Sequence, residues 1–162
     1  MEIERKYTIK QLPANLEGYN FHQITQGYLN TQPVMRIRQE DEHYYMTYKG
    51  DGMLSREEYN LPLNKESFYH LLPKCDGNII KKKRVLIPLE TPSFKDDFIF
   101  EENSLTIELD IFEKPFENLI IAEVEFPSLE AANNFIPPDW FLEDVTFDKR
   151  YHNSNMSRKV FN

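Results

Sequence analysis

The first residues of the chain place two carboxylates and an ammonium group on one face of a predicted strand. With the period of two of a β-strand, Glu2, Glu4 and Lys6 point to one side and Ile3 to the other. Carboxylates two residues apart on a strand lie roughly 6.5 Å apart along it, close enough for both to bind one divalent cation. The solvated face of an edge strand shows the same alternation, so the interpretation depends on whether the rest of the chain repeats it.

The pattern returns in later segments of the sequence. Ionisable residues two positions apart occur at Arg36/Arg38, Arg56/Glu58, Lys82/Arg84, Glu108/Asp110 and Glu123/Glu125, and Lys49 lies on a further alternating segment. Several pairs are purely acidic or purely basic. An antiparallel sheet with one solvated face explains the alternation, but it does not explain why ionised groups stand there in place of Ser, Thr, Gln and Asn.

The elements that must position these residues are mostly strands joined by short turns. Alternation and turn signals predict strands at 23–31, 34–39, 44–50, 54–63, 78–89, 105–112 and 120–126, and helices at 64–72 and from Ser128 to the Pro137-Pro138 stop. Consecutive strands with short connections pair antiparallel. Residues 92–103 are interpreted as a strand extension or a hairpin around 98–100, and the tail from Trp140 is expected to cover apolar surface of the sheet.

We therefore predict an α+β protein, mainly antiparallel β, in which an eight-stranded, closed or nearly closed β-barrel holds the charges inside and a few helices flank it. Buried ions are costly without partners, so the interior is expected to hold a polyanion at its bases and divalent cations at its acids. Unit charges 4 Å apart attract by roughly 4 kcal/mol at an effective dielectric constant near 20, so several bases would bind a triphosphate-sized anion firmly. Carboxylate oxygens without a His or Cys cluster favour Mg²⁺ or Mn²⁺.

The composition limits the class of protein. Of the 162 residues 40% are hydrophobic, and Cys75 is the only cysteine, which excludes an internal disulfide. The formal net charge of −8 argues against a nucleic-acid binder with a basic surface. No apolar run reaches membrane-spanning length. We expect one cytoplasmic domain over residues 1–162, with no nucleic-acid or membrane partner, and the sequence does not indicate its oligomeric state.

In these residues the sequence resembles the CYTH, or triphosphate tunnel metalloenzyme, superfamily over nearly its whole length. The family's Glu-x-Glu-x-Lys motif appears at Glu2, Glu4 and Lys6, and further blocks follow in the family's order. They are Arg36/Arg38, Lys49, Arg56/Glu58, Lys82/Arg84, Glu108 to Phe112, Glu123 to Phe126 and Asp148 to Asn153. Because the family's inward lysine falls in the run 81–83, alternation with Arg84 selects Lys82, and a slip of one residue would exchange the set.

The resemblance implies a role for each block. Glu2, Glu4, Glu123 and Glu125 are expected to be the central metal ligands, and Glu58, Glu108 and Asp110 further ligands. The expected phosphate ligands are Lys6, Arg36, Arg38, Lys49, Arg56, Lys82, Arg84 and Arg150. Lys82 and Tyr28 are candidates to assist proton transfer, although the Tyr28 hydroxyl would serve equally to hold a phosphate.

The preferred hypothesis is metal-dependent hydrolysis of inorganic triphosphate to pyrophosphate and phosphate, since no segment clearly builds a nucleobase pocket. The resemblance leaves a class IV-type adenylate cyclase, a nucleoside triphosphatase or a thiamine triphosphatase as alternatives, so the substrate is inorganic triphosphate or a triphosphate-bearing organic molecule. Two hypotheses in which the protein is not an enzyme are a polyphosphate-binding module and a structural barrel with a solvated charged face.

Overall fold

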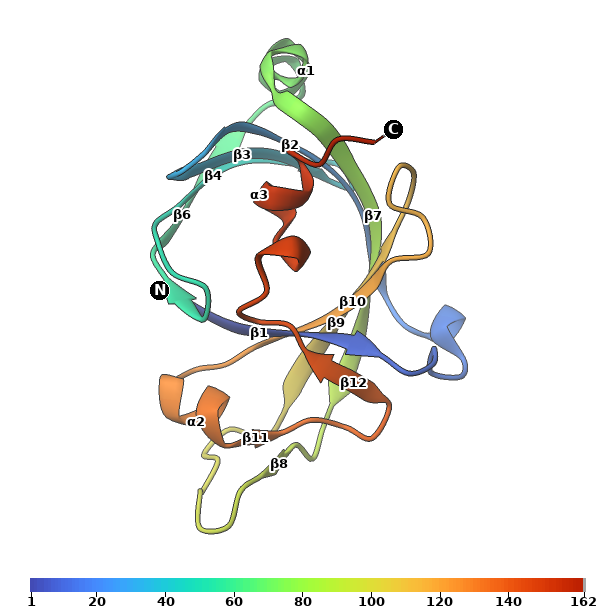
Figure 1. Ribbon diagram of the computed structural model, residues 1–162, viewed down its shortest axis with the longest axis vertical. Helices are drawn as coiled ribbons and strands as arrows, with labels where there is room; N and C mark the ends of the chain where they lie inside the picture. Colours follow the sequence, from blue (N-terminus) through green and yellow to red (C-terminus); the bar gives the residue numbers. More distant parts are fainter. Residues whose placement is uncertain (162) are drawn as a thin grey trace.

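The computed structural model describes residues 1–161, and its main element is a single antiparallel sheet bent into a ring (Figure 1). The strand order is β12-β1-β10-β9-β7-β2-β3-β4-β6, and β5 pairs with β1. The strands of this sheet are β1 (Glu2–Ile9), β2 (Phe21–Thr31), β3 (Val34–Glu40), β4 (His43–Lys49), β5 (Ser55–Arg56), β6 (Glu58–Leu63), β7 (Asp76–Leu89), β9 (Leu105–Phe112), β10 (Ile120–Glu125) and β12 (Phe141–Asp144).

Smaller elements lie around and within the ring. A separate pair consists of β8 (Ser93–Phe94) and β11 (Phe135–Ile136). The α-helices are α1 (Lys65–Leu71), α2 (Leu129–Asn134) and α3 (Asn153–Met156), and the 3-10 turns are η1 (Leu16–Gly18), η2 (Leu72–Lys74) and η3 (Lys149–Tyr151). No helix in residues 1–161 combines the length and the apolar character that a membrane crossing requires.

The ring closes between β4 and β1 through the neighbouring strands β5 and β6. Glu58 of β6 lies opposite Lys49 of β4, and Arg56 of β5 lies opposite Glu2 of β1. Only Glu57 separates β5 from β6, so the two occupy one position in the ring, which then has eight positions. This confirms the predicted eight-stranded antiparallel barrel. The strand predicted over 54–63 is nevertheless interrupted at Glu57, and β12 adds to the edge of β1 beyond β5.

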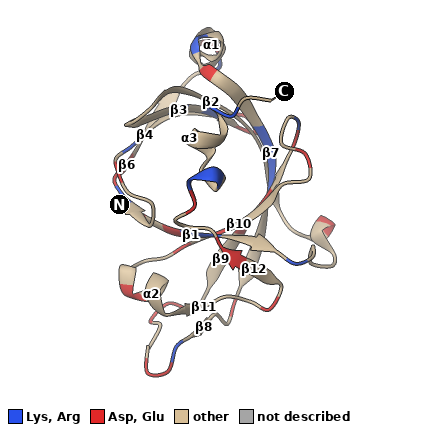
Figure 2. Ribbon diagram, viewed as in Figure 1, with Lys and Arg blue, Asp and Glu red and all other residues tan. Residues whose placement is uncertain are grey.

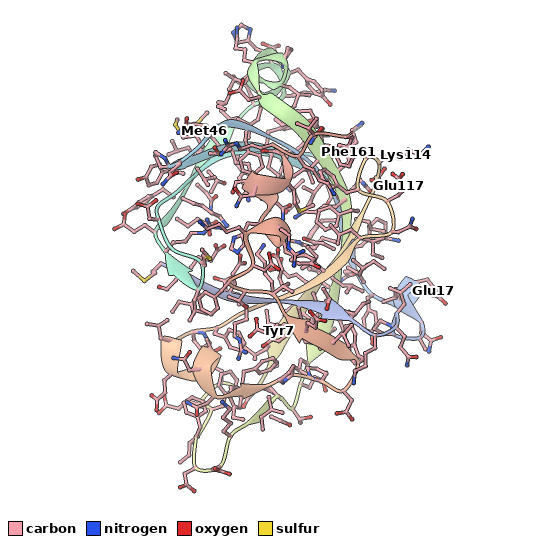
Figure 3. All side chains as sticks on the ribbon, in the orientation of Figure 1. Tyr7, Glu17, Met46, Lys114, Glu117 and Phe161 are labelled. Atoms are coloured by element: carbon pink, nitrogen blue, oxygen red, sulfur yellow. The ribbon has the colours of Figure 1, made fainter. Side chains whose placement is uncertain are left out.

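Apolar residues form one core outside the ring and another inside it. The outer core lies between the outward faces of β1, β10, β9 and β7 and the layer of α2, β11 and β8. Figure 3 shows Tyr7 on this outer side of β1. The inner core is smaller and contains Tyr28, Ile80 and Phe112 with Met156 of α3. One part of the interior is therefore apolar, whereas alternation alone indicated a uniformly charged one.

Local sequence explains several of the smaller elements. Asn64 and Ser128 cap α1 and α2 as predicted, each accepting a hydrogen bond from a backbone N–H three residues later. The expected strand or hairpin at 98–100 is wrong, because Phe98 and Phe100 pack on the outer core without pairing. The tail covers apolar surface only in part: β12 pairs with β1, and α3 enters the ring (Figure 1).

Candidate active site

The ring encloses a cavity of about 390 Å³ whose walls are mostly ionised side chains. The ionisable residues that line it are Glu2, Glu4, Lys6, Tyr28, Arg36, Arg38, Glu40, Tyr45, Lys49, Arg56, Glu58, Lys82, Arg84, Glu108, Glu123 and Glu125, and Val34, Asn60, Asn153 and Ser154 complete the wall. The inward register at the lysine run is the predicted one, since Lys82 is 1% exposed while Lys81 is exposed to solvent.

The charges are divided between two arcs of the ring. The acidic arc is formed by β1, β10 and β9, where Glu4 lies opposite Glu125 and Glu123 lies opposite Glu108. Directly opposed residues on antiparallel strands have Cβ atoms roughly 5 Å apart, so these four carboxylates form one surface. The basic arc is formed by β7, β3, β4 and β5 and carries Lys82 and Arg84, Arg36 and Arg38, Lys49 and Arg56. Figure 2 shows acidic and basic segments at different parts of the ring.

Arg36 is the least satisfied cation of the basic arc. It is 6% exposed, its Nη2 donates to Thr47 Oγ1 at 3.0 Å, and its Nε is buried with no partner among residues 1–161. Burial, reinforced by the neighbouring guanidinium of Arg38, lowers the pKa of Arg36. A buried cation that lines a cavity and has no ion-pair partner among residues 1–161 indicates a site for an anion.

Arg38 and Lys82 are each hydrogen-bonded to a neutral amide. Arg38 Nε donates to Gln26 Oε1 at 2.8 Å, and Lys82 Nζ donates to Asn153 Oδ1 at 3.0 Å. Lys82 also pairs with Asp110 Oδ2 at 2.8 Å. Burial lowers the pKa of Lys82 to about 7, against the opposing effect of Asp110. A lysine with such a pKa is able to give up or take a proton near neutral pH.

Two of the predicted metal ligands, Asp110 and Glu123, each have two cations within 3.1 Å. Asp110 is fully buried outside the cavity wall and pairs with Arg84 through both oxygens, at 2.7 and 2.9 Å. It thus orients Arg84 and Lys82, and we leave it out of the metal ligands. Glu123 does line the cavity, but it accepts from Lys6 Nζ at 2.7 Å and from Arg84 Nη2 at 3.1 Å.

The other carboxylates of the acidic arc have one hydrogen-bonded cation or none among residues 1–161: Glu108 accepts from Arg84 Nη1 at 2.8 Å, and Glu2 accepts from Lys49 Nζ at 2.7 Å. Partial burial raises the pKa of Glu125 to about 7, and the charges of Glu2, Glu108 and Glu4 raise it further in the same direction. Burial likewise raises the pKa of Glu108, although Arg84 opposes the shift. Carboxylates that repel one another in a pocket fit a hard divalent cation, whose charge would remove the repulsion. Within residues 1–161 no three acidic, His or Cys side chains are already arranged around one metal position.

The structure does not bring Arg150 into the site. Its side chain is 82% exposed and pairs with Asp148, at 2.7 Å between Arg150 Nη2 and Asp148 Oδ2. The C-terminal block instead contributes Asn153, which is 8% exposed and lines the cavity. Gln26, which is completely buried, was also missed. Neither residue is charged. The only indications in the sequence were that Asn153 belongs to the last motif shared with the family and that Gln26 lies two residues before Tyr28.

A closed antiparallel ring with opposed acidic and basic arcs defines a class of proteins that bind anions together with cations inside a barrel. Residues 1–146 match the CYTH domain family, and the chain belongs to that family. It is 36% identical to an inorganic triphosphatase of Nitrosomonas europaea, over 98% of each chain, and 31% identical to an inorganic triphosphatase of Acetivibrio thermocellus, over 99% of this chain and 95% of that one. It also resembles a crystal structure of an inorganic triphosphatase with a TM-score of 0.67 and 32% identity, covering 100% of this chain and 97% of the other.

Proposed function

We propose that this protein is a cytoplasmic, metal-dependent hydrolase that converts inorganic triphosphate to pyrophosphate and phosphate. The observation that carries the proposal is the buried Arg36 guanidinium, which lines the cavity beside Arg38 and has no ion-pair partner among residues 1–161. The names of the two relatives support the same substrate. The cavity wall supports a bare triphosphate over a nucleotide, since Tyr28 and Tyr45 are its only aromatic residues among residues 1–161 and both have polar neighbours.

Phosphate oxygens would be held by the basic arc. Phosphoryl transfer asks the protein mainly for positioning and for stabilisation of the charge on the transferred group. Arg36 and Arg38 offer donors on one strand, and Lys82 and Arg84 offer donors on β7. We also assign Lys6, Lys49 and Arg56 to this set, because all three line the cavity. Lys49 Nζ lies 2.7 Å from Glu2 Oε1, so it would move from Glu2 to a phosphate oxygen on binding.

The acidic arc would hold Mg²⁺ or Mn²⁺, with Glu2, Glu4, Glu108 and Glu125 as ligands and Glu58 and Glu123 beside them. When bound, the cation neutralises phosphate charge and acidifies the attacking water. Lys82, with its pKa near neutrality, is suited to protonate the leaving phosphate. Tyr28 is 3% exposed and its hydroxyl accepts from Gln26 Nε2 at 3.2 Å, so it is placed to donate its own proton toward the cavity.

The test is phosphate release from inorganic triphosphate, ATP and thiamine triphosphate with Mg²⁺ or Mn²⁺, together with a measurement of cyclic AMP. We expect rapid release from inorganic triphosphate, slower release from the organic triphosphates and no cyclic AMP. Cyclic AMP formation without release from inorganic triphosphate would overturn the proposal in favour of a cyclase. Tight binding of triphosphate without any turnover would indicate a polyphosphate-binding module.

A further inference from the structure

Two neutral amides, Gln26 on β2 and Asn153 on α3, connect the cations of the basic arc. Gln26 Nε2 donates to Asn153 Oδ1 at 3.0 Å, and the same oxygen accepts from Lys82 Nζ at 3.0 Å. At the other end, Gln26 Oε1 accepts from Arg38 Nε at 2.8 Å. We propose that Gln26 and Asn153 are positioning residues that hold Arg38 and Lys82 in place for the triphosphate without neutralising them. This inference rests on the proposed function.

The two cations determine how each amide group is oriented, that is, where its oxygen and its nitrogen lie. Arg38 and Lys82 are hydrogen-bond donors only, so the amide that meets each of them must present its oxygen. With Gln26 Oε1 on Arg38, the Gln26 amino group is left to face Asn153, whose oxygen serves both neighbours. The second hydrogen of that amino group is donated to Tyr28 Oη at 3.2 Å. One arrangement therefore connects five polar side chains, and it fixes the positions of two cations and one hydroxyl.

The neutrality of the pair matters because the ligand is an anion. Carboxylates in these two positions would also accept from Arg38 and Lys82, but they would cancel charge that the triphosphate needs and repel it. Asp110 already supplies the one carboxylate on Lys82, from outside the cavity wall. The amides thus complete the hydrogen bonding of the cations and leave their charge directed at the cavity.

Asn153 reaches this position because the C-terminal segment is fixed to the start of β7. Asn78 donates from its backbone N–H to Ser157 O at 2.6 Å, and from its side chain to Met156 O and Lys159 O at 3.2 and 2.7 Å. Met156 packs in the inner core. The last helix therefore contributes a side chain to a site that is otherwise built from strands.

The experiment measures kcat and KM for inorganic triphosphate in Asn153→Ala, Asn153→Asp, Gln26→Leu and the double variant Gln26→Leu/Asn153→Ala. Asn153→Ala is expected to lower kcat/KM at least tenfold. Asn153→Asp keeps the shape and the acceptor, so it should fold normally and raise KM at least tenfold through its charge. Because the two residues act as one unit, the double variant should lose little more than the worse single variant.

Two further variants test whether activity depends on the side chain of Asn153 itself or only on the docking of α3. Asn155→Ala changes an exposed asparagine of the same helix and should leave kcat and KM unchanged. Asn78→Ala removes two bonds that fix the tail but keeps the backbone bond to Ser157, so it should lower the melting temperature and lower kcat/KM less than Asn153→Ala does. If Asn155→Ala loses as much activity as Asn153→Ala, or if Asn153→Asp has a normal KM, the amide pair has no positioning role.

The outcome for the amide pair is distinguishable from the outcome for the proposed function. An inactive wild type overturns the hydrolase, and titration of each variant with inorganic triphosphate then tests the pair by itself. Asn153→Asp should bind triphosphate at least tenfold more weakly than the wild type. Equal binding by Asn153→Asp and the wild type would overturn the inference whether or not the protein turns over its ligand.

Discussion

At the scale of single residues, the buried guanidinium of Arg36 is expected to destabilise the ligand-free protein and to strengthen binding of the triphosphate. Its guanidinium is buried, its pKa is lowered by burial and by Arg38, and its Nε has no acceptor in residues 1–161. Replacing a poorly compensated buried charge by an apolar side chain of similar size is often neutral or stabilising by roughly 1–4 kcal/mol. A charge-assisted hydrogen bond to a ligand is worth roughly 1.5–3 kcal/mol.

Arg36→Met is therefore predicted to raise the melting temperature of the ligand-free protein by roughly 2–16 °C and to weaken triphosphate binding about tenfold to a hundredfold. Differential scanning fluorimetry and calorimetric titration measure the two effects. Lys81→Met, at an exposed position of β7, is the matched control and should change neither. A fall in melting temperature with unchanged affinity would show that Arg36 has a structural role alone.

Glu125 gives the site a predicted pH dependence. Burial and the charges of Glu2, Glu108 and Glu4 raise its pKa to about 7, so it is protonated below that pH and ionised above it. A divalent cation must displace this proton, so affinity for Mn²⁺ should rise up to tenfold per pH unit as pH increases from 6 to 7 and level off above about pH 8.

Glu125→Gln should weaken Mn²⁺ binding most at pH 8 and flatten this dependence, as measured by titration at several pH values. Glu117→Gln is the control, because Glu117 lies exposed in the loop between β9 and β10 (Figure 3). Because the pKa of Glu125 is raised from 4.5 to about 7, its contribution to the stability of the ligand-free protein falls as pH rises from about 4.5 to about 7 and is lost above that. A pH profile that Glu125→Gln leaves unchanged would assign the titration to another carboxylate.

At the scale of elements, the strands were predictable because each carries its own period-two signal. Alternation predicted the inward face of β1, β3, β7, β9 and β10, and short turns predicted the antiparallel pairing of consecutive strands such as β2 and β3, but not the pairing of β1 with β10 or of β2 with β7. Alternation does not predict which charged residues form ion pairs with each other. It placed Asp110 on the inward face, but the contacts of Asp110 with Arg84 and Lys82 depend on the pairing of β7 with β9 and on how deep each side chain lies.

The C-terminal elements were the least predictable. Helix α3 spans only Asn153–Met156, which is too short for a periodic signal, and it is fixed by bonds to Asn78 far back in the chain. Arg150 and Asn153 belong to the same sequence block, yet only Asn153 lines the cavity. Charge was a good guide to the strand residues, whereas here a neutral residue reaches the site and a charged one stays outside.

Gly77, at the start of β7, is predicted to control the docking of α3. Its φ of +70° lies in the left-handed region, and a Cβ there would come within 2.0 Å of Ser157 O. Gly77→Ala should destabilise the protein by roughly 1–3 kcal/mol and also lower kcat/KM by displacing Asn153. Gly18→Ala, where a Cβ meets nothing within 4 Å, is the control for both measurements. A normal melting temperature for Gly77→Ala would show that the tail docks without this close approach.

At the scale of the whole molecule, a chain with a net charge of −8 has a cavity with one basic and one acidic arc. Most of the segregation follows strand order, since the acidic β1, β10 and β9 are consecutive in the sheet, although Lys6 lies on β1 and Glu58 on β6. Ion pairs such as Arg84–Glu108 and Lys49–Glu2 join the two arcs in the ligand-free protein, so a ligand that binds one arc leaves charges of the other arc unpaired. A structural barrel with a solvated face would have no need of such segregation.

The two ligands should therefore stabilise the fold together more than the sum of their separate effects. A ligand at one hundred times its dissociation constant stabilises the native state by about 2.7 kcal/mol, which corresponds to roughly 5–11 °C for a chain of this length. We expect inorganic triphosphate with Mg²⁺ to raise the melting temperature by at least that amount, and triphosphate with EDTA, or Mg²⁺ alone, to raise it by much less. The same additions to Arg36→Met should give a smaller rise, because triphosphate at one to ten times its weakened dissociation constant stabilises the native state by only about 0.4–1.4 kcal/mol. If triphosphate and Mg²⁺ leave the wild-type melting temperature unchanged, the opposed arcs do not form a ligand site, and the charged interior has a structural role.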